Sequence, residues 1–147
     1  MAQDSQYLAI HIGEASFLLH GAVSLAIEKR NSLLPKTESN KAAAWRKHKK
    51  GNWPAYALDS DLNLASADVW QRAVFIPATP HPVGLAADEI ELLSDEEIYP
   101  EPFTPVGCQI PGVGCLFSSA WVNQGRVHLV LDPDKLALYL QSLGQAG

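Results

Sequence analysis

Apolar residues recur at every second position near both ends of the chain. Residues 7–12 alternate in this way, which predicts a half-buried strand, and Gly13-Glu14 predicts a turn into a returning strand over residues 15–20. Residues 126–131 show the cleanest alternation, with Val127, Leu129 and Leu131 on one predicted inward face. A turn at residues 123–125 joins that strand to a preceding one over residues 115–122. Each end therefore contributes a predicted hairpin.

The middle of the chain predicts further short strands over residues 53–58 and 70–76, and a long extended segment over residues 83–93. Residues 21–34 are ambiguous, because apolar positions there also fit a short helix. A terminal helix is predicted over residues 133–143, with Asp132 as its cap and Leu136, Leu140 and Leu143 on one face. Strands do not alternate with helices, so the pattern predicts an all-β barrel or sandwich.

Composition narrows the class of protein. The chain has 147 residues, 47% of them hydrophobic, which is enough for one domain or for two small lobes that share a core. The net charge of −5 argues against a protein whose main task is to grip nucleic acid. Residues 1–7 carry no basic residue, and the uncharged residues 102–125 contain prolines and glycines, so neither a secretory signal nor a membrane helix is expected.

Two cysteines, Cys108 and Cys115, are too few for a secreted disulfide scaffold. Reduced thiols in the cytosol are expected, and a single hairpin disulfide is the alternative. No second Cys or His pair stands at ligand spacing, so no zinc site is predicted.

Residues 36–52 form the polar stretch of the sequence and are predicted to be a flexible basic loop. The basic block within it, Lys41 to Lys50, is expected in an exposed loop or a short helix. Its charges are interleaved with Trp45 and Trp53, as in proteins that bind single-stranded nucleic acid. Three interpretations remain open: a solvated loop, a docking site for an acidic protein surface, and a nucleic-acid site.

Catalytic and metal motifs are not found in the sequence. There is no nucleophile elbow, phosphate loop or His-Glu-x-x-His pattern, and His11 and His128 are expected to be ordinary residues of a polar strand face. Residues 59–63 begin like a calcium loop, but the positions that need Gly and Glu hold Leu64 and Trp70, so an acidic turn is predicted. Asp88 and Glu89, as neighbours on one strand, are expected to point to opposite faces. No catalytic, cofactor or metal residue is predicted, and an enzyme would need groups that only the fold could bring together.

Three segments carry a resemblance to a known family. Residues 83–90 read Val-Gly-Leu-Ala-Ala-Asp-Glu-Ile, and residues 125–132 read Gly-Arg-Val-His-Leu-Val-Leu-Asp, followed by Lys135-Leu136. The opening hairpin, with Phe17 and the turn that ends at Pro35, is the third. In this order the segments resemble the CheW-like domain of bacterial chemotaxis coupling proteins.

The resemblance implies one CheW-like domain over residues 1–147, built from two small five-stranded β-barrel lobes with a shared core and a short C-terminal helix. It implies a non-catalytic adaptor without cofactors. The partners would be the regulatory domain of a CheA-type histidine kinase and a methyl-accepting chemoreceptor, in the cytoplasm at membrane-associated receptor arrays.

One departure from the family pattern concerns the basic turn. Typical members have an Asn-x-Arg-Gly turn, whereas Lys50-Gly51 occupies that place here, and lysine lacks the bidentate fork of arginine. An accessory coupler of a pilus or gliding-motility pathway is therefore an alternative. The candidate partner-binding residues are Arg46, Lys49, Lys50, Gly51 and Trp53. A small β-barrel that binds nucleic acid through Lys41 to Lys50 is the alternative from another class.

Overall fold

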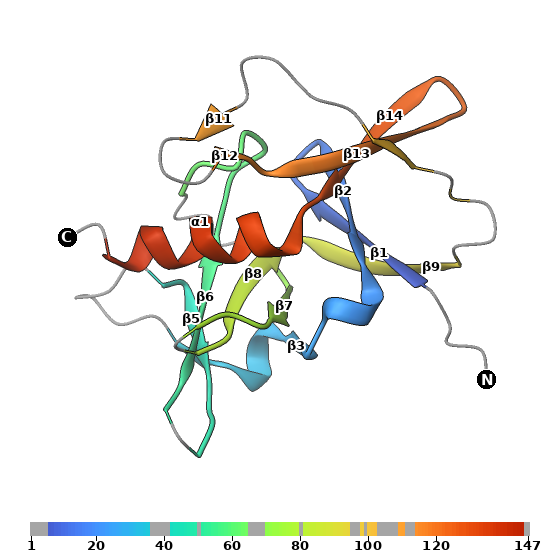
Figure 1. The fold of residues 1–147 in the computed structure, drawn as a ribbon. Coiled ribbons are helices and arrows are strands. Elements are labelled where there is room, and N and C mark those ends of the chain that lie inside the picture. Colours follow the sequence, from blue (N-terminus) through green and yellow to red (C-terminus); the bar gives the residue numbers. More distant parts are fainter. Residues whose placement is uncertain are drawn as a thin grey trace.

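The computed structural model describes residues 6–35, 42–49, 51–64, 70–79, 81–94, 98, 100–102, 109–110 and 114–145. Most of these residues lie in strands, which form two curled sheets, and one helix, α1 (Pro133–Gln145), runs across them (Figure 1). We call the sheets the terminal lobe and the central lobe.

The terminal lobe combines strands from both ends of the chain, in the order β10-β13-β14-β2-β1-β9. Its strands are β1 (Gln6–Ile12), β2 (Ala15–His20), β9 (Glu89–Ser94), β10 (Glu101–Pro102), β13 (Phe117–Asn123) and β14 (Arg126–Leu131). The predicted hairpins are confirmed as β1–β2 and β13–β14. A short parallel pairing of β14 with β2 joins them.

The central lobe is made from the intervening chain, in the order β3-β7-β8-β6-β5-β4. Its strands are β3 (Ala26–Lys29), β4 (Leu34–Pro35), β5 (Ala44–Arg46), β6 (Trp53–Ala57), β7 (Arg72–Ile76) and β8 (Val83–Ala87). A separate two-stranded ribbon pairs β11 (Gln109–Ile110) with β12 (Gly114–Cys115). The predicted fold class, all-β with two lobes and a terminal helix, is confirmed. Among the described residues, each lobe has five longer strands and one two-residue edge strand.

Several local predictions need correction. The possible helix in residues 21–34 is absent from that described segment, which instead contains two 3-10 turns, η1 (Gly21–Val23) and η2 (Arg30–Ser32), on either side of β3. The predicted flexible loop contains β5, because Ala44 is buried in the central lobe and pairs with Ala55 of β6. Residues 36–41 and Lys50 of that loop lie outside the described residues.

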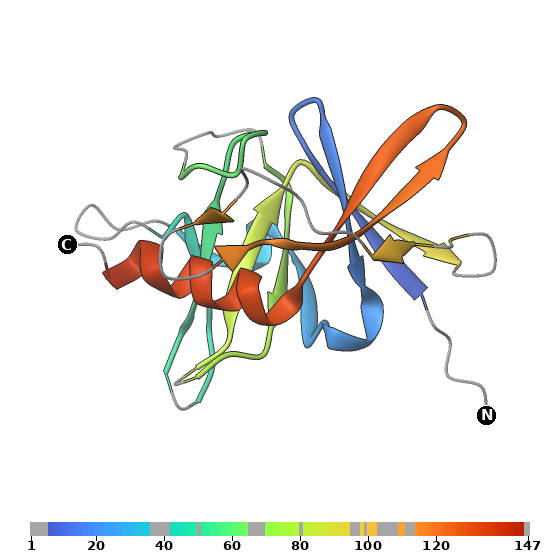
Figure 2. The same ribbon diagram turned by 45° about the horizontal axis from the view of Figure 1, so that its top comes forward.

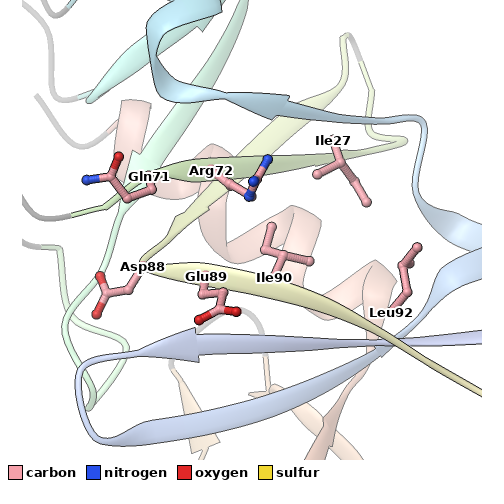
Figure 3. Close-up of a pocket in the computed structure, with 7 residues that line it drawn as sticks. All are labelled: Ile27, Gln71, Arg72, Asp88, Glu89, Ile90 and Leu92. Atoms are coloured by element: carbon pink, nitrogen blue, oxygen red, sulfur yellow. The ribbon is translucent and has the colours of Figure 1, made fainter.

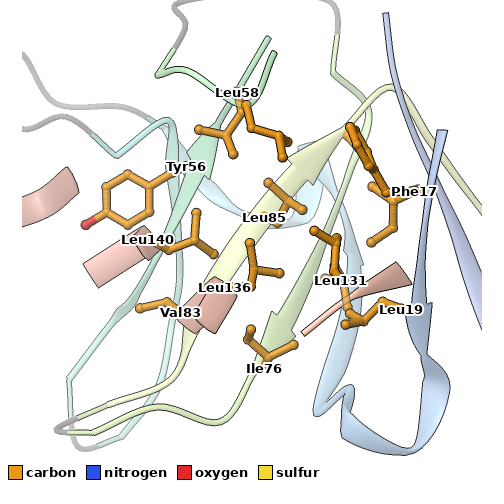
Figure 4. Packing of buried hydrophobic residues seen from close by; sticks show 14 of the residues in the cluster. Phe17, Leu19, Tyr56, Leu58, Ile76, Val83, Leu85, Leu131, Leu136 and Leu140 are labelled. Carbon is orange, nitrogen blue, oxygen red and sulfur yellow. The ribbon is translucent and has the colours of Figure 1, made fainter. Parts of the chain in front are cut away.

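The shared core lies between the two lobes and beneath α1 (Figure 4). Leu136 and Leu140 of the helix are fully buried there, beside Leu85 of the central lobe and Leu131 of the terminal lobe. The Asp132 carboxylate accepts hydrogen bonds from the backbone N–H groups of the first helical turn, which confirms the predicted cap. The helix thus closes the core that the two lobes share.

The predicted inward face of β14 is correct for only part of the strand. Leu131 is buried and Leu129 is half-buried against the shared core, but Val127 is 61% exposed. The β13–β14 hairpin extends beyond the point where β14 pairs with β2, so Val127 has no core beneath it.

The acidic turn at residues 59–63 is confirmed. The Asp59 carboxylate accepts hydrogen bonds from the N–H groups of Asp61 and Asn63, at 2.9 and 3.0 Å. Leu62 takes a positive φ of 64° in this turn, and its carbonyl accepts a hydrogen bond from the Tyr139 hydroxyl of α1. Burial, and then the nearby Asp59 carboxylate, raise the pKa of Tyr139, which keeps its hydroxyl a donor. The Asp59 carboxylate therefore holds the turn at residues 59–63 together.

Candidate partner-binding surfaces

The β5–β6 hairpin brings together two of the predicted site residues, Arg46 and Trp53. Arg46 Nε donates to Glu28 Oε2 of β3 at 2.8 Å, and its guanidinium lies 4.9 Å from the centroid of the Trp53 ring. The His48 ring stacks on Trp53 with centroids 4.6 Å apart, and Trp53 also contacts Phe75 of the central lobe. Arg46 and Trp53 therefore stabilise the hairpin, and their polar and aromatic groups are already engaged within the chain.

The tip of the same hairpin carries the other predicted site residues. Lys49 and Gly51 are exposed, and Gly51 has a φ of 133°, which favours glycine because it lacks a Cβ. Its backbone N–H donates to the His48 carbonyl at 3.2 Å, which closes the turn. Lys50 lies outside the described residues. The hairpin tip thus presents the Lys49 ammonium to solvent, at a place separate from the Arg46–Trp53 contact.

A groove runs between the two lobes, and sequence reasoning did not find it. Its volume is about 520 Å³, and Figure 3 shows the side chains that line it: Ile27, Gln71, Arg72, Asp88, Glu89, Ile90 and Leu92. One wall belongs to β3 and β7 of the central lobe, and the other belongs to β9 of the terminal lobe. Both β3 and β9 are edge strands, so the groove lies where the two sheets meet edge to edge.

Exposed apolar side chains give the groove its chemistry. Leu92 is 62% exposed and Ile27 is 38% exposed, on opposite walls of the groove. Arg72 adds one positive charge, and Asp88 and Glu89 add two negative charges. Large apolar side chains gathered at a concave surface with a charged rim are typical of a protein interface. The groove can therefore hold an apolar segment that carries charges along its edges.

The expectation for Asp88 and Glu89 was wrong, because it assumed one continuous strand. Asp88 lies at a bend between β8 and β9, and both residues line the groove. One Asp88 carboxylate oxygen accepts a hydrogen bond from the Gly13 N–H at 2.9 Å, and the Asp88 N–H donates to the His11 carbonyl at 2.8 Å. Asp88 therefore holds the β1–β2 turn against the junction of the lobes.

A hydrogen-bonded row of side chains crosses the outer face of the terminal lobe. His11 of β1 contacts Ser16 Oγ of β2 through Nδ1, at 2.7 Å, and Glu91 Oε1 of β9 through Nε2, at 2.6 Å. The sequence contained no signal for this row, because the pairing depends on the register of three strands. The row ties β2, β1 and β9 together, as expected of polar residues on a solvent-facing sheet.

Within the described residues, no group of three or more His, Cys, Asp or Glu side chains is arranged to hold a metal ion. Cys115 is a half-buried free thiol in this part of the chain, and Cys108 lies outside it. None of the described helices has the length and apolar character needed to cross a bilayer.

Comparisons with known proteins bear on the fold. No protein-family model and no curated protein matches the amino-acid sequence. The crystal structure of the scaffolding protein TtCheW from Thermoanaerobacter tengcongensis is similar, with a TM-score of 0.65 and 14% sequence identity. The match covers 91% of this chain and 92% of that one. Two curled sheets and a terminal helix, matched over nearly the whole length, show that this chain has the CheW-like fold.

Proposed function

We propose that this chain is a non-catalytic adaptor of a bacterial chemosensory system. It works in the cytoplasm as one domain over residues 1–147, and it bridges a CheA-type histidine kinase and a methyl-accepting chemoreceptor. The observation that carries the proposal is the apolar groove between two edge strands, in a fold similar to a scaffolding protein over 91% of the chain.

The groove is the proposed main contact. Ile27 and Leu92 approach a bound segment from opposite walls, and both are exposed in the free protein. Covering such side chains with a partner removes apolar surface from water, at roughly 25 cal/mol per Å². Arg72 and Glu89 then select a segment with complementary charges along its edges.

The basic turn is the proposed second contact. Lys49 is exposed at the hairpin tip, next to Gly51. Arg46 is committed to Glu28 and Trp53, so it does not substitute for the arginine that typical family members have in this turn. A lysine turn makes weaker, less directional contacts than an arginine turn. This difference supports an accessory coupler, of the kind that would serve a pilus or gliding-motility pathway.

The groove is tested by calorimetric titration with two partners from the same genome: the regulatory domain of each CheA-type kinase and a receptor cytoplasmic fragment. We expect Leu92→Glu to weaken binding of at least one partner by tenfold or more, since it puts a charge among apolar contacts. Leu138→Glu is the matched control, because Leu138 is also an exposed leucine, at 51%, but lies on α1 and does not line the groove. Equal affinities for Leu92→Glu and the unmodified protein would exclude the groove, and no binding by any partner would reject the adaptor.

The turn is tested by Lys49→Glu in the same titrations. We expect affinity to fall about threefold to tenfold and the fall to shrink at high salt, as for a charge at an interface rim. Thermal unfolding should be unchanged, because Lys49 is exposed. An unaltered affinity would remove the turn from the interface.

A further inference from the structure

A second opening lies in the terminal lobe, between β2 and β14. Apart from Ser60, it is lined by two runs of four consecutive residues, 14–17 and 126–129. A pocket on the face of a sheet is lined by alternate residues of each strand, because consecutive side chains point to opposite faces. Consecutive residues on both walls therefore mean that the edges of the two strands face the opening. We call it the strand slot.

The register of the sheet explains how the slot arises. β14 pairs with β13 along its length, and β2 pairs with β1 from Ala15 onward. Between β14 and β2 the pairing consists of Leu129 with Phe17 and Val130 with Leu18. Toward their starts the two strands diverge, and Figure 2 shows the β1–β2 and β13–β14 hairpins opening as a V. In the described chain, residues 15–16 and 126–128 thus have a ladder partner on one edge only.

The two faces of the slot differ in chemistry. On the side of the shared core, its walls carry Phe17 and Leu129, with the exposed Val127 at the opening. On the outer side, they carry Arg126 and His128, and Glu14 of the β1–β2 turn also lines the opening. Burial, then the Arg126 guanidinium and the nearby His11 ring, lower the pKa of His128, so this ring is mostly uncharged at neutral pH and Arg126 supplies the positive charge on this side. A segment that enters the slot meets apolar groups on one face and the Arg126 guanidinium on the other.

We propose that the strand slot binds an extended segment of a partner protein by strand addition, with apolar residues on its inner face and carboxylates on its outer face. Unpaired N–H and C=O groups on a strand edge select an extended backbone, because only that conformation matches their spacing. The volume of about 460 Å³ suits a few residues of such a segment. This surface is separate from the groove between the lobes, so the inference goes beyond the proposed adaptor contact.

The probe is a capped peptide in which valine and aspartate alternate, Thr-Val-Asp-Val-Asp-Val-Thr. It is titrated into isotopically labelled full-length protein while amide shifts and hydrogen exchange are followed by NMR. We expect saturable shifts within residues 15–16 and 126–128, and slowed exchange at those amides among them that point into the slot, because these N–H groups gain a partner. The same peptide with alternate amides N-methylated should not bind. Binding by both peptides, or no change at these amides at millimolar peptide, would overturn the proposal.

Charge reversal tests the outer face of the slot. Arg126→Glu should weaken the aspartate peptide about tenfold and favour a peptide with lysine in place of aspartate. Lys29→Glu is the matched control, since it reverses an equal exposed charge on the central lobe and should leave both affinities unchanged. If these amides instead shift with protein concentration in the absence of peptide, the occupant is a second copy of this chain and the partner proposal is wrong. Failure here leaves the groove titrations unaffected, so the two proposals are distinguishable.

Discussion

The two lobes share a plan of five longer strands and one short edge strand, but their interiors are filled differently. The shared core beneath α1 is built mostly from leucine and isoleucine, such as Leu85 and Leu136. The interior of the central lobe contains mainly alanines around Phe75 and Trp70: Ala44, Ala55, Ala57, Ala73 and Ala86. In the shared core, long side chains fill the space between the two lobes and α1. In the central lobe, the small alanine side chains let neighbouring strands pack closely.

Gly84 of β8 shows how close that approach is. A Cβ at this position would lie 2.6 Å from Phe75 Cε2 and 3.0 Å from Ala55 Cβ. These atoms belong to β7 and β6, the two strands that flank β8. We therefore expect the two interiors to respond in opposite ways. The shared core should lose most stability when side-chain atoms are removed, and the central lobe should lose most stability when side-chain atoms are added.

The largest effect is expected for Leu136→Ala. Leu136 is fully buried in the shared core, so the change leaves a cavity beneath α1 and should lower the free energy of unfolding by about 3 kcal/mol. Leu138→Ala on the same helix is the control, because Leu138 is half exposed and should cost less than about 0.5 kcal/mol. Urea unfolding of both variants measures the difference. Equal losses would mean that α1 does not close the core.

A smaller effect is expected for Gly84→Ala, which adds one methyl group to the central lobe. Phe75 must shift to accept it, and we expect a loss of about 2 kcal/mol in the free energy of unfolding. Gly125→Ala adds the same group where nothing lies within 4 Å, so its cost reflects only the positive φ of that turn. A Gly84→Ala protein as stable as the unmodified one would contradict the close packing of β6, β7 and β8.

The smallest effect is expected for Tyr139→Phe. This change removes the hydrogen bond from the helix to the Leu62 carbonyl and should cost about 1 kcal/mol, which tests how firmly α1 is attached to the turn after β6. The fluorescence or circular dichroism unfolding midpoint should fall slightly with an unchanged slope. A midpoint at or above that of the unmodified protein would show that this bond adds no stability.

The sequence predicted the features that depend on local pattern. The hairpins at both ends follow from alternation, and the Asp132 cap follows from its place before the terminal helix. Strand β5 was missed because its three residues lie in a polar stretch, where only the pairing of Ala44 with Ala55 reveals a strand. Val127 was placed inward because alternation does not show where a neighbouring strand ends.

The candidate surfaces were harder to predict because they depend on distant pairs. The basic turn was recognised, but the partner of Arg46 is Glu28, on a strand whose pattern was ambiguous. The groove requires β3 and β9 to meet, and the strand slot requires β2 and β14 to diverge. Neither relation leaves a trace in residue spacing, since both follow from how two sheets are assembled.

The order of the strands along the chain has a consequence for how the protein forms. Every strand of the central lobe lies between residues 26 and 87, as one uninterrupted insertion between β2 and β9. The terminal lobe instead needs Leu129 to find Phe17, a contact that spans most of the polypeptide and carries a large loop-closure cost. On the ribosome, the central strands can pair while β14 and α1 are still being synthesised. The leucine-rich core between the lobes stays open until the last segment emerges, so the slowest folding step is expected to be the docking of β14 with the helix that follows it.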